Sequence, residues 1–431
     1  MTTLEWQPTP ALVRGAVASV VLILPAVVFG RPELLVLATP LLVSTVWMLV
    51  NRPRTVPHLT TTLAHPFLRE GEGTLVRAKL TASIDVEHAV LAVRPHSWLG
   101  FDASRGVNGG HVALPSEAVT VSVPVRSTRW GRRLVGEALV AATSRWAGFR
   151  IGPEHCDALP LTTLPSPGRF DTRAPTPHPI GLVGLNPSRR SGDGSEFSSI
   201  RPFAAGDRLR RIHWRVTLRT GTIHVTTAVA EQDSNVMLVV DGLTDIGVGT
   251  GVGDRPSSLD VAVRAAGAIA EHYLHRGDRV GLRVLGPTRD NMVPTGAGNG
   301  HLRRLLDTLA AIVPGSTKHT DPVRTQFRVG AGAVVIVLSP MLSPEAVKVP
   351  VVLASRGLSV IVIDTLPDDP GRTGDERTRL AWRIRLLERA EVLRRVEVVG
   401  VPVVTWRGPG TLDEVLRNLG RRASRPRLVR R

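Results

Sequence analysis

"NVMLVVD", residues 235–241, is the stretch that decides the fold of the C-terminal half of this 431-residue chain. It is a continuous apolar run ending in an aspartate, the pattern of a parallel strand covered on both faces. Strand and helix patterns alternate after it, so an open α/β sheet is predicted. Such sheets bind ligands at the carboxyl ends of their strands, where Asp241, Ser339 and Asp364 fall. The further strands are predicted at 279–286, 332–340, 358–364 and 401–407, and the helices at 257–275, 300–313 and roughly 373–396.

The block just upstream, "GSEFSSIRPFAAGDRLRRIHWRVTLRTG" (194–221), is rich in arginine. It could be a brace between domains, a surface for a partner or an anion, or a catalytic loop. We favour the brace, in which Asp207 anchors an ion-paired turn and Trp214 packs as a plug between the β region and the α/β sheet. A catalytic role is disfavoured because no nucleophile with a positioned base is visible.

Two apolar segments open the chain, at about 11–29 and 34–50, with "GRPE" between them. Each approaches the roughly 20 residues that a membrane span requires. A signal peptide or a buried helical pair would be the alternatives, but "VVFGRPE" offers no convincing cleavage site and a second apolar run follows at once. A two-helix membrane hairpin is therefore predicted.

Basic residues predict the orientation of this hairpin. Arg14, Arg52 and Arg54 flank its outer ends, against Arg31 in the loop. The positive-inside rule places both ends in the cytoplasm. We therefore expect an integral protein of the inner or cytoplasmic membrane with its soluble domains in the cytoplasm.

The region 55–164 has the period-two pattern of strands, with turn residues between the runs. This spacing predicts an antiparallel β-sandwich. The proline-rich residues that follow are interpreted as a linker. The strand-like runs are 74–84, 88–95, 118–127, 133–144 and 148–153.

The formal net charge of +17 is carried almost entirely by arginine. It indicates either an anionic partner, such as nucleic acid or lipid headgroups, or arginine scattered over a solvated surface. The second interpretation is favoured, except in the arginine-rich tail 421–431, because arginines occur in every segment. A single cysteine, Cys156, excludes an intramolecular disulfide and a cysteine-based zinc site.

One set of spaced residues resembles the signature of the bacterial domain-of-unknown-function family fifty-eight. A strand ending in Asp241 follows it, and His213 replaces the acid that the family usually has before its tryptophan. The layout of the whole chain agrees with this family. The signature residues are Phe197, Arg201, Phe203, Gly206, Asp207, Arg211, Ile212, His213 and Trp214.

The resemblance implies that the C-terminal part is similar to a von Willebrand factor A domain. Such domains usually hold a divalent cation with Asp-x-Ser-x-Ser after the first strand, and here "DGLTD" (241–245) stands there. Asp241, Thr244, Asp245 and Thr295 would be the oxygen ligands of a degenerate site, but Leu243 cannot ligate. We therefore expect weak or absent Mg²⁺ binding, and no cofactor.

Three functions compete. The resemblance implies a membrane-anchored scaffold or adaptor acting with a MoxR-type AAA+ ATPase in protein assembly or envelope processes. The charge suggests an anionic-partner binder as the alternative, but the chain lacks the aromatic interleaving of a specific nucleic-acid site. An enzyme is disfavoured, since no phosphate loop, zinc spacing or triad is present.

The sequence thus predicts a multidomain protein with a two-helix transmembrane hairpin, an antiparallel β-sandwich and an α/β von Willebrand factor A-like domain. Substrate and oligomeric state are not predicted. The divisions are a membrane hairpin 1–54, a β-sandwich 55–164, a linker 165–193, a signature segment 194–231, an α/β domain 232–420 and a basic tail 421–431.

Overall fold

A computed structural model describes most of the chain, in two compact units. The first is essentially Met1–Leu164, and the second is Pro165–Arg431 apart from Thr250–Val252. The predicted basic tail and most of the predicted linker lie outside the described residues. The structure describes residues 5–101, 108–112, 118–166, 187–204, 207, 209, 212–231, 235–247, 256–287, 292–315, 333–367, 375–407 and 411.

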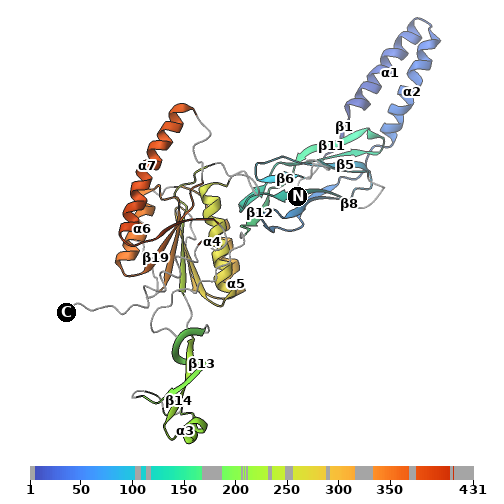
Figure 1. Cartoon of the computed structure of the whole chain (residues 1–431). Helices are drawn as coiled ribbons and strands as arrows, with labels where there is room; N and C mark the ends of the chain where they lie inside the picture. The colour runs from blue at the N-terminus through green and yellow to red at the C-terminus, as the bar shows by residue number, and fades with distance from the viewer. Residues whose placement is uncertain are drawn as a thin grey trace. The chain divides into compact units, whose positions relative to one another are not determined.

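The first unit begins with a helical hairpin, α1 (Pro10–Val28) and α2 (Pro32–Val50), drawn in blue in Figure 1. Both helices are long and apolar enough to cross a membrane. Their contact face is built from small side chains: Ser19, Ala26, Ala38 and Thr45 are buried. The large apolar side chains point outward instead, as is usual for helices that lie in lipid.

Two antiparallel sheets follow and enclose one apolar core, which confirms the predicted antiparallel β-architecture. One sheet has the order β1-β11-β10-β5-β7 and the other β2-β4-β8-β6. A small sheet β3-β12-β9 contains the parallel pair β3–β12. The strands are β1 (Gln7–Pro8), β2 (His58–Leu63), β3 (Phe67–Arg69), β4 (Gly73–Thr81), β5 (Val86–Val93), β6 (Leu99–Phe101), β7 (Asn108–Val112), β8 (Ala118–Ser127), β9 (Gly131–Val135), β10 (Ala138–Ser144), β11 (Phe149–His155) and β12 (Leu159–Leu164).

The alternation of β4 and β8 shows why the period-two pattern is informative. Residues Val76, Ala78 and Leu80 of β4 are buried, while the residues between them face solvent or are partly exposed. The predicted run 133–144 is not one strand but two, since Glu137 has a φ of +57° between β9 and β10.

The signature segment forms an arm of the second unit. Strand β13 (Pro187–Pro202) pairs antiparallel with β14 (His224–Glu231), and the short helix α3 (Trp214–Thr220) lies between them in sequence. Residues 187–193 were predicted to be linker, and the structure places them in β13 instead. Backbone pairing with β14 needs no apolar periodicity, so this strand could not be predicted from the residue pattern.

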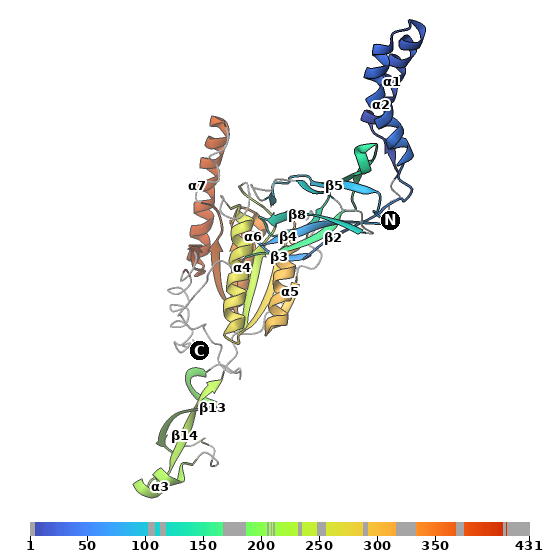
Figure 2. The same cartoon turned by 90° about the vertical axis from the view of Figure 1, so that its right-hand side faces the viewer.

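The rest of the second unit is an open α/β sheet with the strand order β17-β16-β15-β18-β19-β20. Helices α4 and α5 cover one face and α6 and α7 the other, as Figures 1 and 2 show. The strands are β15 (Asn235–Asp241), β16 (Arg279–Leu285), β17 (Met292–Gly296), β18 (Val334–Ser339), β19 (Ser359–Asp364) and β20 (Val403–Thr405). The helices are α4 (Ser258–His275), α5 (Asn299–Ala310), α6 (Pro344–Ser355) and α7 (Glu376–Val398).

The predicted α/β alternation is confirmed, with two additions. Strand β17 is antiparallel to β16 at the edge of the sheet. Helix α6 was not predicted, because its valines and Pro350 resemble a strand with a break rather than a helix. Ser343 caps this helix and Pro344 occupies its first position, a start signal that was readable in the sequence.

Candidate functional site at the switch point of the sheet

The strand order reverses between β15 and β18, which makes their carboxyl ends the topological switch point of the sheet. Asp241 ends β15 and Ser339 ends β18, as predicted. The Ser339 hydroxyl donates to Asp241 Oδ2 at 2.6 Å, and both residues are buried. The same hydroxyl accepts from the Met341 amide at 2.8 Å, so both groups are engaged within the protein.

The loop after Asp241 is held by the start of α4. Asp241 Oδ1 accepts the amide of Leu243 at 3.0 Å, and Asp245 Oδ1 accepts the amide of Leu259 at 3.1 Å. Ser257 caps α4 in a capping box with Asp260. The carboxylates of the "DGLTD" segment therefore stabilise a turn and a helix N-terminus.

The neighbouring strand end is closed by an ion pair. Asp364 ends β19, and its Oδ1 lies 2.5 Å from an Arg389 guanidinium nitrogen of α7. Both side chains are nearly buried, at 12% and 10% exposure. Arg389 Nε also donates to the carbonyl of Pro340 at 2.6 Å. The charges of Arg389 and Asp364 balance each other, so the pair adds no net charge at this edge of the sheet.

The structure does not bring the four predicted metal ligands together. Thr295 lies in β17 beside Gly281, near the amino end of β16, whereas Asp241 pairs with Leu285 at its carboxyl end. Gly281 and Leu285 are four residues apart along β16, which corresponds to a separation of about 13 Å. The hydroxyl of Thr244 is buried and has no hydrogen-bond partner in the part of the chain that the structure describes.

The oxygen atoms of the remaining predicted ligands do not fit a hard cation. Such a cation needs several free oxygen ligands, and both oxygens of Asp241 and Oδ1 of Asp245 already accept hydrogen bonds. No group of three histidine, cysteine or acidic residues that could hold a metal is found among the described residues.

We expect Mg²⁺ and Mn²⁺ to bind weakly or not at all at this edge. Binding would require breaking the Asp241–Ser339 bond and the cap on α4. Isothermal titration of the detergent-solubilised chain measures this directly. Micromolar affinity that Asp241→Ala abolishes would contradict the expectation.

The pKa of Asp241 is raised above its ordinary value, mainly by burial, although the bonds from Ser339 and Leu243 oppose the shift. A carboxyl group with a raised folded-state pKa stabilises the fold fully below its unfolded pKa, and this contribution is lost as pH rises through the folded value. The contribution of Asp241 to the stability of the α/β domain is therefore smaller at neutral pH than in acid.

We expect Asp241→Asn to raise the unfolding temperature of the α/β domain at neutral pH, because the amide does not titrate and so escapes the stability that burial of Asp241 costs as pH rises. The advantage should shrink as pH falls toward about 4, where the wild-type carboxyl is protonated. Scanning calorimetry of both proteins across this range checks the sign. An advantage that grows at low pH would contradict it.

The arm contains the signature residues, and two of them, Arg201 and Asp207, form an ion pair with two hydrogen bonds. The Arg201 guanidinium makes two bonds to the Asp207 carboxylate, at 2.7 and 2.6 Å, and the Ala204 amide adds a third at 2.9 Å. These donors lower the pKa of Asp207, with Arg201 the largest cause. The ion-paired turn predicted around Asp207 is therefore present.

Other signature residues have backbone roles in the arm. The Phe203 amide donates to the Ile223 carbonyl, and Ile212 bridges to Val225. His213 caps α3 through Nδ1, which accepts the Val216 amide at 3.3 Å. Gly206, Arg211 and the side chain of Phe197 lie outside the described residues.

The prediction that Trp214 is a buried plug is not met, since its side chain is 64% exposed. It is the first residue of α3, a helix of seven residues, which is too short to bury both faces. Leu218, one turn later, is 82% exposed on the same face. Leu209 and Ile223 are also exposed.

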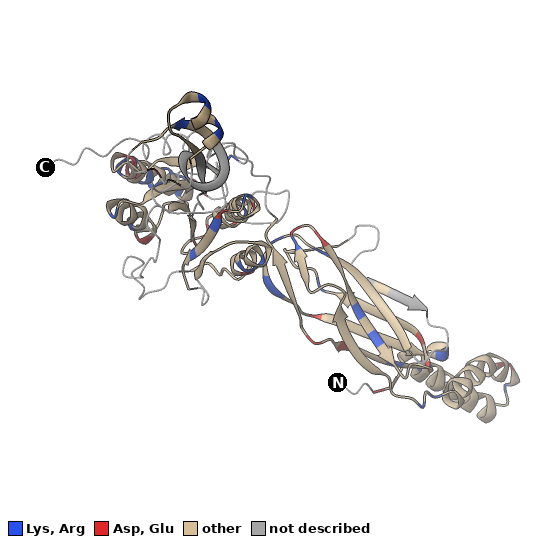
Figure 3. Ribbon diagram, turned by 90° about the horizontal axis from the view of Figure 1, so that it is seen from below, with Lys and Arg blue, Asp and Glu red and all other residues tan. Residues whose placement is uncertain are grey.

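The arm is strongly basic as well. Residues 199–226 hold six arginines and one aspartate, and Figure 3 marks basic positions of the arm in blue. Arg215 and Arg219 are exposed on α3 beside Trp214 and Leu218. We name the exposed side chains Trp214, Leu218, Arg215 and Arg219 the α3 face.

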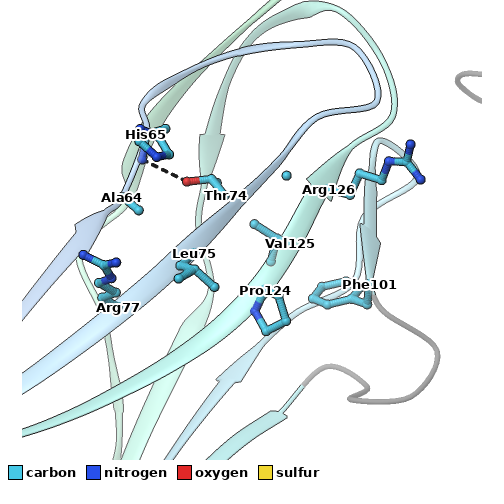
Figure 4. Close-up of a pocket in the computed structure, with 10 residues that line it drawn as sticks. Ala64, His65, Thr74, Leu75, Arg77, Phe101, Pro124, Val125 and Arg126 are labelled. Carbon is cyan, nitrogen blue, oxygen red and sulfur yellow. Dashed lines mark hydrogen bonds between the residues drawn. The ribbon is translucent and has the colours of Figure 1, made fainter.

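A shallow groove of about 700 Å³ lies on the outer face of the β2-β4-β8-β6 sheet. Figure 4 shows Leu75, Pro124 and Phe101 between Arg77 and Arg126, which lie at its two ends. Arg126 is held by the Gly71 carbonyl. The groove is open to solvent, and the buried hydroxyl of Thr74 in its lining accepts the His65 amide at 2.9 Å.

Comparison with known proteins agrees with part of the resemblance. The family model described as Protein of unknown function DUF58 matches residues 199–369. Uncharacterized proteins of Mycobacterium bovis and Mycobacterium tuberculosis are each 29% identical over 184 residues, or 43% of this chain. The chain spans about half the length of these curated relatives, 50% in each case.

Proposed function

We propose that this protein is a membrane-anchored scaffold or adaptor that acts with a MoxR-type AAA+ ATPase in protein assembly or envelope processes. The α3 face is the observation that carries the proposal. Exposed apolar side chains beside exposed arginines form a surface that a partner can cover, because soluble monomers seldom expose such aromatic and aliphatic groups together. An apolar groove with an acidic rim on the partner would complement it.

The hairpin supports the anchoring part of the proposal. Its outward side chains include Val20, Leu24 and Val36, which are 60%, 64% and 74% exposed. Exposing so much apolar surface is unfavourable in water and favourable in a bilayer. The flanking arginines favour the cytoplasmic side for both ends.

The α/β domain supports the adaptor part. A sheet with one antiparallel edge strand, β17, and a switch point between β15 and β18 is compatible with a von Willebrand factor A-like domain. At its switch point Asp241 is bonded to Ser339, and at the neighbouring strand end Asp364 is paired with Arg389, so both carboxylates are engaged within the protein. Recognition by protein surfaces outside this edge therefore fits better than catalysis.

Membrane anchoring is tested by alkaline carbonate washing. We expect the full chain to stay in the membrane fraction and a chain lacking residues 1–54 to be released. Protease added to intact cells should spare the soluble domains if they are cytoplasmic. Release of the full chain by carbonate would refute the anchor, and cleavage from outside would reverse the orientation.

The adaptor role is tested by co-purification from a detergent extract. We expect an AAA+ ATPase with the wild-type chain, and its loss when Trp214 and Leu218 are both replaced by serine. Nucleic acid in place of the ATPase, retained in the double variant, would favour the anionic-partner alternative that the basic arm also suggests.

A further inference from the structure

Both ends of the helical hairpin are tied to the β-domain within a few residues. Before α1, Gln7 pairs with Arg150 and Pro8 with Phe149, so β1 extends the sheet at β11. After α2, the amides of Arg54 and Thr55 both donate to Asp85 Oδ2, at 2.9 and 3.0 Å. A chain fastened on both sides leaves the hairpin little freedom to swing relative to the β-domain.

The turn between β10 and β11 makes a further contact with the helices. Thr9, the N-cap of α1, donates through its hydroxyl to the Ala147 carbonyl at 2.8 Å and through its amide to the Gly148 carbonyl at 3.0 Å. A Cβ on Gly148 would lie 2.9 Å from Met48 Cβ of α2, so this position requires glycine for the backbone to approach the helix.

Trp146 stands at the tip of this turn in an unusual conformation. Its φ is +68° and that of Ala147 is +51°, a left-handed pair that non-glycine residues rarely adopt. The conformation presents the indole outward: Trp146 is 55% exposed, and it meets Trp47 of α2 edge-to-face with the ring centroids 6.5 Å apart. Trp47 itself is 52% exposed.

The position of Trp47 sets the depth of this pair. A helix of 19 residues such as α2 is about 28 Å long, close to the hydrocarbon thickness of a bilayer. Trp47 lies in its last turn. If α2 crosses the membrane, both indoles lie at the boundary between acyl chains and headgroups, where tryptophan is favoured.

The charges around the pair are suited to anionic headgroups. Arg52, Arg145 and Arg150 are exposed. The nearby acids are engaged by the protein, since Asp85 accepts the two amides described above and Glu87 accepts the Trp146 amide at 2.7 Å. Both carboxylates keep their charge, so the three arginines against these two acids leave a small positive excess around the pair.

We propose that the Trp146 turn of the β-domain is itself a membrane-contact site, which inserts its indole at the lipid–water interface beside Trp47 while Arg145, Arg150 and Arg52 contact anionic headgroups. The site rests on the membrane anchoring proposed above and adds a function to the β-domain, which becomes fixed on the bilayer surface. Lipid is the occupant because the exposed indole is continuous with the lipid-facing surface of α2.

The experiment uses the full chain with Cys156→Ser, which removes the native thiol, and one new cysteine carrying an environment-sensitive fluorophore. The positions are Trp146→Cys, Leu134→Cys as a control, and Val20→Cys within α1. Leu134 is 61% exposed in β9, which pairs with β12 in the small sheet and, among the described residues, has no strand contact with β11 or the helices. Each protein is reconstituted into phosphatidylglycerol–phosphatidylethanolamine vesicles.

A probe at 146 should shift its emission to the blue, be quenched by lipids with a shallow nitroxide, and be protected from iodide several-fold better than a probe at 134. A probe at 20 should respond to a deep nitroxide. Arg145→Cys gives the same readout one residue away if the Trp146 variant folds poorly.

Two results would overturn the proposal and are distinguishable. Protection at 20 with full iodide access at 146 and 145 would refute the interfacial contact alone. Full iodide access at positions 20, 145 and 146 would refute the membrane anchor as well.

Discussion

Replacing Arg389 by methionine should destabilise the α/β domain by about 3–5 kcal/mol, the usual result of removing one partner of a buried ion pair. The reason is that Asp364, at 12% exposure, would keep its charge with only the Leu366 amide as a donor among the contacts that hold it now. The carbonyl of Pro340 would also lose its donor. The loss should open the strand ends at β18 and β19 first.

Hydrogen exchange of the β18 and β19 amides in the full chain measures this opening separately from the rest of the molecule. The expected acceleration is roughly a hundredfold to a few thousandfold. Arg394→Ala, which removes an exposed pair with Glu391 on the same helix, is the matched control and should change these rates little.

A double variant separates charge from packing. Adding Asp364→Asn to Arg389→Met removes the carboxylate charge that Arg389→Met leaves without a counter-charge, and it keeps an oxygen for the Leu366 amide. Most of the lost protection should return. If the double variant exchanges as fast as the single one, Arg389 acts by packing and its hydrogen bond rather than as a counter-charge.

The pattern of the sequence was sufficient for the architecture but not for the contacts that close the site. Apolar runs such as 235–241 predict strands because burial on both faces leaves no polar position. The partner of Asp364 could not be found in this way: Arg389 is one of seven arginines on α7, and the one that reaches the sheet is selected by tertiary packing.

The same limit explains Trp214 and Trp146. An isolated tryptophan in a polar block suggests a buried anchor, because burying an aromatic ring is favourable. In the structure, α3 is too short to bury Trp214. Trp146 points outward because its backbone adopts the left-handed conformation, which could not be predicted from the residue pattern. Such departures from local preference are where functional surfaces are to be sought.

Replacing Trp214 by serine should therefore leave stability nearly unchanged and weaken partner binding by at least about 2 kcal/mol, or roughly 30-fold in affinity, and Leu218→Ser should weaken binding less. Leu218 is 82% and Trp214 64% exposed, so truncation creates no cavity and should cost within about 0.5 kcal/mol of stability. Aromatic side chains with neighbouring arginines are the commonest centres of binding energy.

Affinity of the detergent-solubilised chain for the ATPase that we propose as its partner checks this, with calorimetry of the same samples for stability. Leu387→Ser is the matched control, since Leu387 is equally apolar and 73% exposed on α7. Should Leu387→Ser weaken binding as much as Leu218→Ser, the partner surface would extend to α7. A large fall in stability for Trp214→Ser with unchanged affinity would instead restore the brace, because a tryptophan that supports only the fold affects melting and not recognition.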